Sequence, residues 1–320
     1  GVTNELIKKA EKISKNFPNS ERDVLLSTGE QMASALIAGK LCDLGFNSRS
    51  WMSWQIPIIT RGNYSAARII KIGTDQLKRY LKKGGTPIIT GFQGLNKESR
   101  LTTLERGGSD ASAIMLAKFF KAKRCIIYTD VDGVYTTDPN LTKKAKKIKA
   151  LSYEEMLEMS SLGAKVMQPA SIQDAKLNKV KIDVKSSFTN KTGTQIIGRK
   201  KIKDTNIIRG VSFTKNDAKV SLLGVKDKPG VAAAIFEPLY KNSINVDMVV
   251  QNISSDGKET DLTFTIKSDD LLKTKRLISK NRKIKFKKLI VDKNVAKVSI
   301  VGVGMITTPG VTYRMFQALA

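Results

Sequence analysis

The feature that most constrains the fold is a long internal repeat in the last third of the chain. Residues 218–239 read AKVSLLGVKDKPGVAAAIFEPL, and residues 296–319 read AKVSIVGVGMITTPGVTYRMFQAL. The copies are 78 residues apart at AKVS and 80 residues apart at PGV. This spacing is typical of a repeated domain rather than of a short stacked repeat. We therefore expect two related domains in succession, although a duplicated scaffold without any ligand site would give the same repeat.

Each copy has the pattern of a strand, a Pro-Gly turn and a helix. The first copy is followed by two more strand patterns, 246–252 (VDMVVQN) and 260–267 (TDLTFTIK), and then by a lysine-rich helix pattern. This βαββα order predicts a ferredoxin-like domain.

The first 200 residues alternate between helical and strand patterns. The predicted helices span 6–15, 29–44, 109–121 and 152–161, and the predicted strands span 87–90, 124–129 and 180–186. The last of these helices opens with Ser-x-x-Glu, a capping box. Such alternation predicts an α/β sandwich with a mainly parallel sheet. Ligands in such folds bind at the carboxyl ends of the strands.

Composition narrows the chemistry and the setting. The 320 residues include no histidine, which excludes histidine-based triads and most zinc sites. The two cysteines, Cys42 and Cys125, lack the spacing of metal ligands, and a disulfide framework needs more of them. Together with the absence of a signal peptide or a membrane-length apolar run, this predicts a cytoplasmic protein.

A net charge of +27 raises the possibility of nucleic-acid binding. Lysine clusters occur at 143–149, 199–203 and 273–288. Few aromatic residues lie among them, and no nucleic-acid-binding motif is present. We therefore interpret the charge mainly as a solvated lysine surface that helps to gather anionic substrates.

Residues 104–120 read LERGGSDASAIMLAKFF and suit a small anion. Two glycines let the backbone approach a ligand closely, and Ser109 is a good N-cap for the helix that follows. Arg106 adds a planar set of donors, and the start of the helix attracts negative charge. The loop therefore suits a carboxylate or a phosphate, although a tight turn capped for stability would use the same residues.

Four further motifs accompany this loop. They are STGEQMASAL (27–36), interpreted as a capped helix start, GFQG (91–94), YTDVDGVYTTDP (128–139) and GAKVMQP (163–169). With RGGSD, the ordered set resembles the aspartate kinases of the amino acid kinase family, and the repeat resembles their pair of ACT regulatory domains. The resemblance covers almost the whole chain.

The resemblance implies a three-layer α/β/α amino acid kinase sandwich followed by ferredoxin-like βαββαβ ACT domains. The expected limits are 1–203 for the catalytic domain, 204–293 for the first ACT domain and 294–320 for the start of the second. We expect a chain truncated at both ends, without the first strand and its Lys-Phe-Gly-Gly-type loop. Because the lysine of that loop stabilises the transferred phosphoryl group, its loss would cost about 3–4 kcal/mol of barrier lowering. This chain is therefore expected to be a very poor catalyst.

The implied reaction transfers the γ-phosphoryl group of ATP, with Mg²⁺, to the side-chain carboxylate of L-aspartate. The product, 4-phospho-L-aspartate, opens the biosynthesis of lysine, threonine and methionine. A carboxylate nucleophile is already ionised at neutral pH, so the absence of histidine is no obstacle.

The resemblance also implies roles for individual residues. Glu30 would bind the substrate ammonium group, Arg106 would grip a substrate carboxylate, and Asp110 would organise a catalytic lysine. The other implied substrate residues are Thr3, Phe92, Gly107, Gly108 and Ser109. The implied nucleotide residues are Thr129, Asp130, Tyr135, Asp138, Lys165 and Val166. The implied effector residues are Asp227, Gly230, Ala232, Asn245, Asp247 and Gln251. No residue is implied as a protein ligand for a metal.

Several of these residues also have plain structural interpretations. Glu30 and Asp110 are acids of the kind favoured in a first helical turn. Tyr135 could belong to the core, and Lys165 could be a solvated surface lysine. Two positions depart from the family pattern: Asn140 replaces the usual arginine, which puts one nucleotide contact in doubt, and Gln168 stands where many members have histidine.

The expected partners are L-aspartate, ATP and an amino-acid effector, lysine or threonine, that shifts the enzyme toward an inactive state. We expect a homo-oligomer, or a hetero-oligomer with a separate regulatory subunit, formed through the ACT domains; no membrane partner is expected. The alternatives are another member of the family, such as a glutamate-type or nucleotide kinase, and a non-catalytic amino-acid sensor. A nucleic-acid binder is a third alternative, suggested by charge alone.

Overall fold

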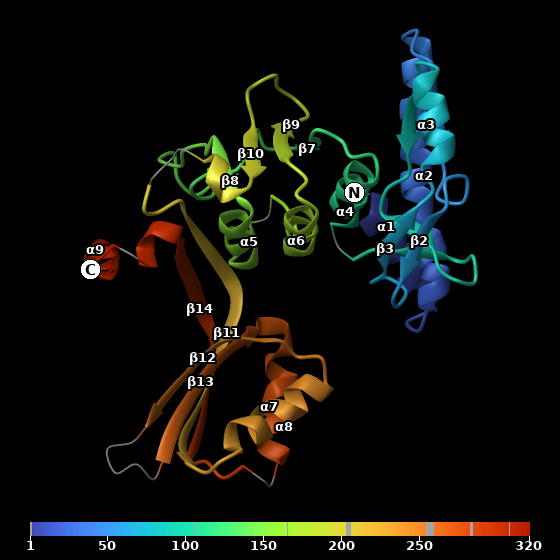
Figure 1. Ribbon diagram of the computed structural model, residues 1–320. Coiled ribbons are helices and arrows are strands. Elements are labelled where there is room, and N and C mark those ends of the chain that lie inside the picture. Colours follow the sequence, from blue (N-terminus) through green and yellow to red (C-terminus); the bar gives the residue numbers. More distant parts are fainter. Residues whose placement is uncertain are drawn as a thin grey trace. The chain divides into compact units, whose positions relative to one another are not determined.

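The computed structural model describes residues 2–105, 107–164, 166–202, 206–253, 259–281, 284–306 and 308–320. The chain forms two compact units, Gly1–Gly210 with Val301–Ala320, and Val211–Ile300. Figure 1 shows the helices and strands of both units.

The larger unit alternates helices and strands along the chain. Its helices are α1 (Val2–Ile13), α2 (Asn19–Asp43), α3 (Asp75–Lys82), α4 (Gly108–Phe119), α5 (Tyr153–Ser161), α6 (Pro169–Asn178) and α9 (Val311–Leu319), with 3₁₀ turns η1 (Arg199–Lys201) and η3 (Val303–Ile306). Its strands are β1 (Ser48–Trp51), β2 (Ile58–Arg61), β3 (Arg68–Ile72), β4 (Thr86–Ile89), β5 (Gln93–Leu95), β6 (Leu101–Thr103), β7 (Cys125–Thr129), β8 (Ala150–Ser152), β9 (Ile182–Ser186) and β10 (Thr194–Ile197).

Parallel pairs are prominent in this unit. Strand β1 pairs with β4, β7 with β9, and β10 with β8, each in parallel, while β9 and β10 run antiparallel. A separate sheet has the order β3-β2-β5-β6. The predicted α/β class with parallel strands is confirmed. In the β7-β9 pair Thr129 lies opposite Ser186, so the carboxyl ends of these two strands meet at one edge.

Helix α4 joins the two hydrophobic cores of the larger unit. It contributes Met115 to a core that also contains Trp51 and Leu77. It contributes Ile114 to a second core, which contains Leu151 and Ile182. Helix α4 is therefore held by packing against both cores, which fixes the helix that follows the RGGSD motif.

Helix α2 differs from the prediction. The expected helix spans 29–44, with a capped start within STGEQMASAL, but α2 begins at Asn19 and places Glu30 near its middle. The hydroxyls of Ser27 and Thr28 donate to the carbonyls of Val24 and Leu25, each at 2.7 Å. Bonds back to the preceding turn let serine and threonine sit inside a helix, so their capping pattern was misleading.

The smaller unit is built from β11 (Gly210–Lys226), α7 (Val231–Lys241), β12 (Val246–Ile253), β13 (Glu259–Lys267), the 3₁₀ turn η2 (Ser268–Asp270), α8 (Leu271–Lys280) and β14 (Lys288–Val301). The sheet order is β12-β13-β11-β14. Helices α7 and α8 lie side by side against one face of this sheet (Figure 1). The βαββαβ order confirms the predicted ferredoxin-like fold.

The sequence repeat is also a repeat of local backbone geometry. Gly230 caps α7 with φ 87°, and Gly310 caps α9 with φ 86°. Both values lie in the left-handed region, where glycine is favoured because it lacks a Cβ. The limit expected between residues 293 and 294 falls inside the unbroken strand β14. The domain limits themselves stay a prediction.

Candidate functional site

A buried carboxylate fixes helix α2 in the larger unit. Asp23 is fully buried and accepts four hydrogen bonds. The backbone N–H and hydroxyl of Ser65 donate at 2.8 and 2.7 Å, and those of Thr103 donate at 2.7 and 2.8 Å. Helix α2, which carries Glu30, is therefore tied to the end of β6, just before the RGGSD loop.

The GFQG segment is tied to the same helix. Gln31 donates from Nε2 to Oε1 of Gln93 at 3.1 Å, and Nε2 of Gln93 donates to the carbonyl of Ser27 at 3.2 Å. Gln31 directly follows Glu30, so these bonds set the Glu30 region against the start of β5. The sequence pattern did not point to this pair of glutamines.

The same segment also contacts the start of α4. The backbone N–H of Phe92 donates to Oγ of Ser112 at 2.9 Å, and Ser112 Oγ donates to the carbonyl of Gly108 at 2.8 Å. Leu104 N–H donates to the carbonyl of Phe92 at 2.9 Å. The structure thus brings GFQG, the start of α4 and α2 together. Ser112 is a connecting residue that the motif analysis missed.

Close packing explains both glycines of the loop. Gly107 is left-handed at φ 80°, and a Cβ there would lie 2.1 Å from Cγ of Gln168. A Cβ on Gly108 would lie 2.6 Å from Cβ of Leu104 and 2.7 Å from Cδ2 of Phe92. Real Cβ atoms do not approach other atoms so closely, so both positions require glycine.

The cap of α4 corrects one prediction. Gly107 occupies the N-cap position, and the helix begins at Gly108. Ser109 therefore lies inside the first turn with an exposed side chain, and is not the cap. The tight contact of Gly107 with Gln168 explains the shift, because only glycine fits at the point where the chain enters the helix.

Two acids of the predicted site have perturbed ionisation. Burial raises the pKa of Asp110, in the first turn of α4, to about 6. Burial also raises the pKa of Glu30 above its ordinary value. Both carboxyl groups thus lie in partly dehydrated surroundings, where a positively charged partner would stabilise their ionised forms.

The remaining predicted substrate residues are placed as follows. Thr3 is an exposed residue of α1, next to Val2, whose Cγ1 lies 3.2 Å from the Cβ position of Gly29 on α2. Thr3 thus directly follows Val2, whose side chain lies against Gly29, the residue before Glu30. Arg106 lies outside the described residues, and so does Lys165 of the nucleotide set.

Two of the predicted nucleotide residues, Thr129 and Asp130, lie at the carboxyl end of β7. Thr129 is the last residue of that strand, and its Oγ1 donates to Oδ1 of the exposed Asp130 at 3.0 Å. Val166 packs partly buried against the neighbouring core. Asp138 accepts from the N–H of Asn140 at 2.9 Å, which closes a local turn.

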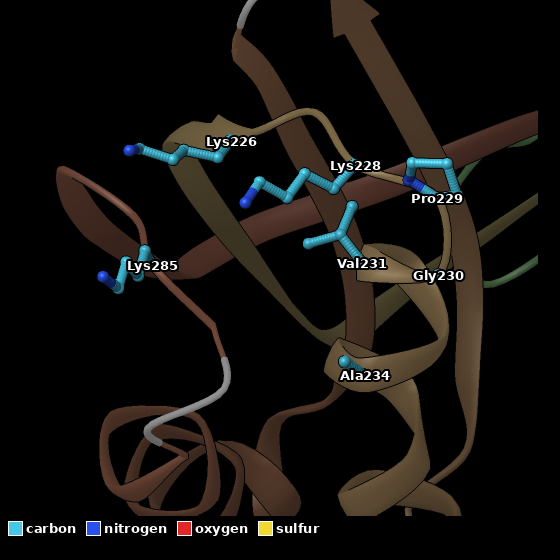
Figure 2. A pocket seen from close by; sticks show the side chains of 7 residues that line it. All are labelled: Lys226, Lys228, Pro229, Gly230, Val231, Ala234 and Lys285. Carbon is cyan, nitrogen blue, oxygen red and sulfur yellow. The ribbon is translucent and has the colours of Figure 1, made fainter.

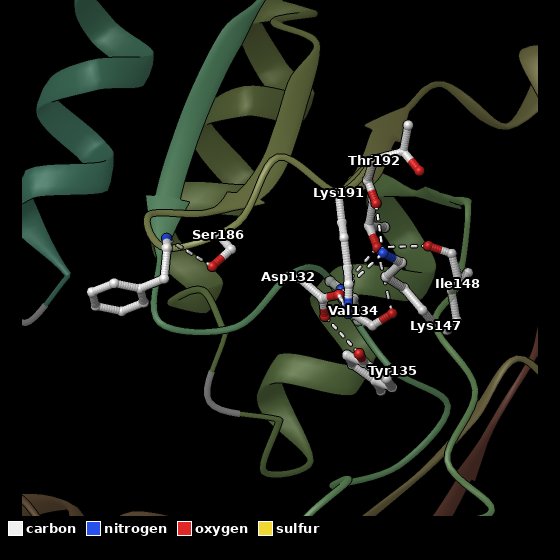
Figure 3. A network of polar contacts seen from close by, with 10 residues as sticks. Asp132, Val134, Tyr135, Lys147, Ile148, Ser186, Lys191 and Thr192 are labelled. Carbon is white, nitrogen blue, oxygen red and sulfur yellow. Dashed lines mark hydrogen bonds and ion pairs between the residues drawn. The ribbon is translucent and has the colours of Figure 1, made fainter.

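A polar cluster around Asp132 adjoins this edge (Figure 3). Tyr135 donates its hydroxyl to Oδ1 of Asp132 at 2.5 Å, and Lys147 Nζ donates to Oδ2 at 3.3 Å. The hydrogen bond from Tyr135 contributes most to lowering the pKa of Asp132, and the contact with Lys147 lowers it further. Tyr135 is partly exposed, so it is not simply a core residue.

The smaller unit holds a pocket of about 300 Å³ at the N-terminus of α7 (Figure 2). Its lining residues are Lys226, Lys228, Pro229, Gly230, Val231, Ala234 and Lys285. Of the predicted effector residues, Gly230 lines the pocket. Asp247 instead forms an ion pair with Lys297, which also approaches Asp217 at 3.8 Å. Asp227, Asn245 and Gln251 are exposed, and Ala232 is on the first turn of α7.

The described residues lack two features that would have pointed to other functions. They contain no group of three or more acidic or cysteine side chains arranged to hold a metal ion. They also contain no helix with the length and apolar character needed to cross a lipid bilayer.

Comparisons with known proteins identify the family. The profile of the Amino acid kinase family matches residues 1–186, and an ACT domain profile matches residues 220–281. The aspartokinase of Bacillus sp. (strain MGA3) is 40% identical over 320 residues, which are 100% of this chain and 78% of that relative. The aspartokinase of Helicobacter pylori (strain ATCC 700392 / 26695) is 43% identical over 324 residues, covering 100% of this chain and 80% of that relative.

Solved structures give the same result. Aspartokinase III of E. coli in complex with aspartate and ADP has a TM-score of 0.80 and 26% identity, and the match covers 99% of this chain and 71% of that chain. The complex of the same enzyme with lysine and aspartate has a TM-score of 0.74 and 27% identity, over 93% of this chain and 68% of that chain. The chain therefore belongs to the aspartokinases of the amino acid kinase family.

Proposed function

We propose that this protein phosphorylates the side-chain carboxylate of L-aspartate with ATP, forming 4-phospho-L-aspartate, under feedback control through its ACT domains. The observation that carries the proposal is the set of hydrogen bonds joining the Glu30 helix, GFQG and the RGGSD loop. Its relative, aspartokinase III of E. coli, is known in complex with aspartate and ADP.

The geometry suits an amino acid held by its charged ends. Glu30 lies on α2, which is fixed against β6 by Asp23, and its carboxylate would take the ammonium group. The amides at the start of α4, with Ser109 and Arg106, would take a carboxylate. Asp110, whose pKa is about 6, is mostly ionised at neutral pH and would orient a nearby cation. Catalysis here depends on positioning and charge neutralisation.

The chemical step needs no protein base. An oxygen of the ionised aspartate side chain attacks the γ-phosphorus, the bond from that phosphorus to the bridging oxygen breaks, and ADP leaves with the bond electrons. The substrate carboxylate carries no proton at neutral pH, which explains why a histidine-free site suffices.

The nucleotide would bind at the carboxyl end of β7. The proposed contacts are Thr129, Asp130, Tyr135, Asp138, Lys165 and Val166. Mg²⁺ would arrive as part of the MgATP substrate, held by phosphate oxygens and water. This suits the described residues, which offer no cluster of three acidic ligands, and it suits Mg²⁺, which keeps several waters in most protein sites.

The regulatory proposal concerns the smaller unit. Lysine or threonine would bind at the ACT domains through Asp227, Gly230, Ala232, Asn245, Asp247 and Gln251. The support is the pocket at the start of α7, which Gly230 lines, and the complex of E. coli aspartokinase III with lysine. We also propose the domain limits 1–203, 204–293 and 294–320, a cytoplasmic setting, and assembly of subunits through the ACT domains.

The direct test is aspartate-dependent formation of ADP by the complete gene product. We expect turnover with L-aspartate and MgATP, and little with L-glutamate. The Glu30→Gln variant should raise KM for aspartate at least tenfold while leaving KM for ATP unchanged, because it removes one charge-assisted contact to the ammonium group. ADP formation that does not depend on aspartate would exclude the proposal.

A further inference from the structure

The loop between β9 and β10 begins at the candidate nucleotide edge. Ser186 ends β9 directly opposite Thr129, the last residue of β7. The next residue, Ser187, donates its N–H to the carbonyl of Thr129 at 2.8 Å. The loop 187–193 was not among the motifs, yet its first residue is hydrogen-bonded directly to Thr129, next to Asp130.

The loop backbone is held at both ends. At its start, the N–H of Phe188 donates to Oγ of Ser186 at 3.0 Å. At its end, Lys147 donates to the carbonyl of Thr192 at 2.6 Å (Figure 3). A Cβ on Gly193 would lie 1.8 Å from the carbonyl oxygen of Val184, so only glycine lets the chain return to the sheet here. The loop is thus anchored rather than loosely attached.

This anchored loop exposes an aromatic ring and a cation. Phe188 is 80% exposed, and the side chain of Lys191 is 70% exposed. An exposed aromatic residue is not unusual by itself. Tyr240, for example, is 82% exposed on α7 in the other unit. Phe188 differs because it directly follows Ser187, whose N–H donates to the carbonyl of Thr129 at the end of β7, where the nucleotide is proposed to bind.

The charge beside the loop favours an anion. Asp132 faces two lysines, Lys147 at 3.3 Å and Lys191 at 3.9 Å (Figure 3). Around Asp132 itself, one carboxylate thus faces two ammonium groups, which leaves a local excess of positive charge. Such a charge attracts phosphates.

We propose that loop 187–193 forms one wall of the nucleotide site, where the ring of Phe188 packs on the purine base and Lys191 attracts the phosphates. The inference rests on the proposed function, because it takes ATP as the nucleotide. Aromatic rings stack on bases without needing a sequence-specific hydrogen bond, since every base presents a flat apolar face. Phe188 is then a binding residue for the base, and Lys191 is a residue for the phosphates.

The test compares ligands with and without a base. Binding of ATP and of inorganic tripolyphosphate is measured on the wild type, Phe188→Ala, Phe188→Tyr and Lys191→Gln. Phe188→Ala should weaken the binding of ATP about tenfold and leave the affinity for tripolyphosphate unchanged, since tripolyphosphate has no base to stack. Phe188→Tyr should restore ATP binding, and Lys191→Gln should weaken both ligands. Tyr240→Ala is the matched control for loss of an exposed ring and should change neither.

Equal ATP affinity in the wild type and Phe188→Ala would overturn the inference. So would an equal loss of ATP and tripolyphosphate in that variant, because the ring would then act on the loop and not on the base. The two proposals can fail separately. If the protein phosphorylates aspartate but its ATP affinity does not depend on Phe188, only the proposed role of the loop fails. If ATP affinity depends on Phe188 but aspartate is not phosphorylated, only the proposed reaction fails.

Discussion

Asp23 and Thr103 are joined by two hydrogen bonds in the interior of the larger unit, from the backbone N–H of Thr103 at 2.7 Å and from its hydroxyl at 2.8 Å. Asp23 is seven residues before Glu30 on α2, about two helical turns. Thr103 ends β6, just before the RGGSD loop. This pair therefore sets the spacing between the two parts of the site that would hold the two ends of aspartate.

Replacing Asp23 with alanine should loosen both parts. The change leaves the buried donors of Thr103 and the half-buried donors of Ser65 without their acceptor, at about 1–3 kcal/mol for each buried group. The free energy of unfolding in urea should fall by at least about 2 kcal/mol, and KM for aspartate should rise. Asp43→Ala is the control, since the side chain of Asp43 is 67% exposed in its pair with Lys40. Equal stability of the two variants would contradict the anchoring role.

Asp110 should make stability depend on pH. Its pKa in the folded protein is about 6, above the ordinary 3.8, so the folded state holds the proton more tightly. This contribution is fully present below about pH 4 and is lost as the pH rises through about 6. The free energy of unfolding of the wild type should therefore decrease relative to Asp110→Asn across this window. Glu30 titrates in both proteins and cancels. Parallel curves would show that Asp110 is not buried as described.

Gly108→Ala should damage the site more than the fold. The added methyl group would meet Leu104 and Phe92 at 2.6 and 2.7 Å, forcing the loop and GFQG apart. We expect a stability loss of about 1–3 kcal/mol and a larger loss of kcat/KM for aspartate than for ATP. Gly39→Ala is the control: it lies inside α2 with nothing within 4 Å of the Cβ position, and should stabilise the helix by about 0.5–1 kcal/mol. An active, stable Gly108→Ala variant would refute the close packing.

Local signals predicted the elements well and the contacts between them poorly. The capping box at Ser152 was confirmed, because Ser152 and Glu155 lie in one helical turn and need no distant partner. The start of α2 was wrong because hydroxyls of Ser27 and Thr28 bond within the helix instead of capping it. The cap of α4 was wrong because Gln168, 61 residues after Gly107, decides which residue fits there.

For the site, too, local motifs were predicted well and contacts between distant residues were not. The ordered motifs identified the family, and the structure brings three of the segments they named into contact: α2, GFQG and the start of α4. The residues that join them, Asp23 and Ser112, carry no motif, because their roles depend on partners up to 80 residues away in the chain. Only the folded structure shows that Asp23 contacts Thr103 and that Ser112 contacts Phe92.

Effector binding should depend on the lysines of the smaller unit. The carboxylate of lysine or threonine would meet the amides at the start of α7 beside Lys228 and Lys285. Each of Lys228→Gln and Lys285→Gln should raise the concentration for half-maximal inhibition about two- to fivefold, as expected for exposed charges. Lys241→Gln, which breaks an exposed pair with Glu237, is the control. Activity that stays constant at high concentrations of both amino acids would disprove this form of regulation.

The most direct test is a crystal structure of the complete gene product with L-aspartate and a non-hydrolysable ATP analogue. The account predicts the substrate ammonium group within about 3 Å of the Glu30 carboxylate, a carboxylate of aspartate at the start of α4, and the γ-phosphate facing the other carboxylate. Aspartate bound away from both Glu30 and the RGGSD loop would contradict it.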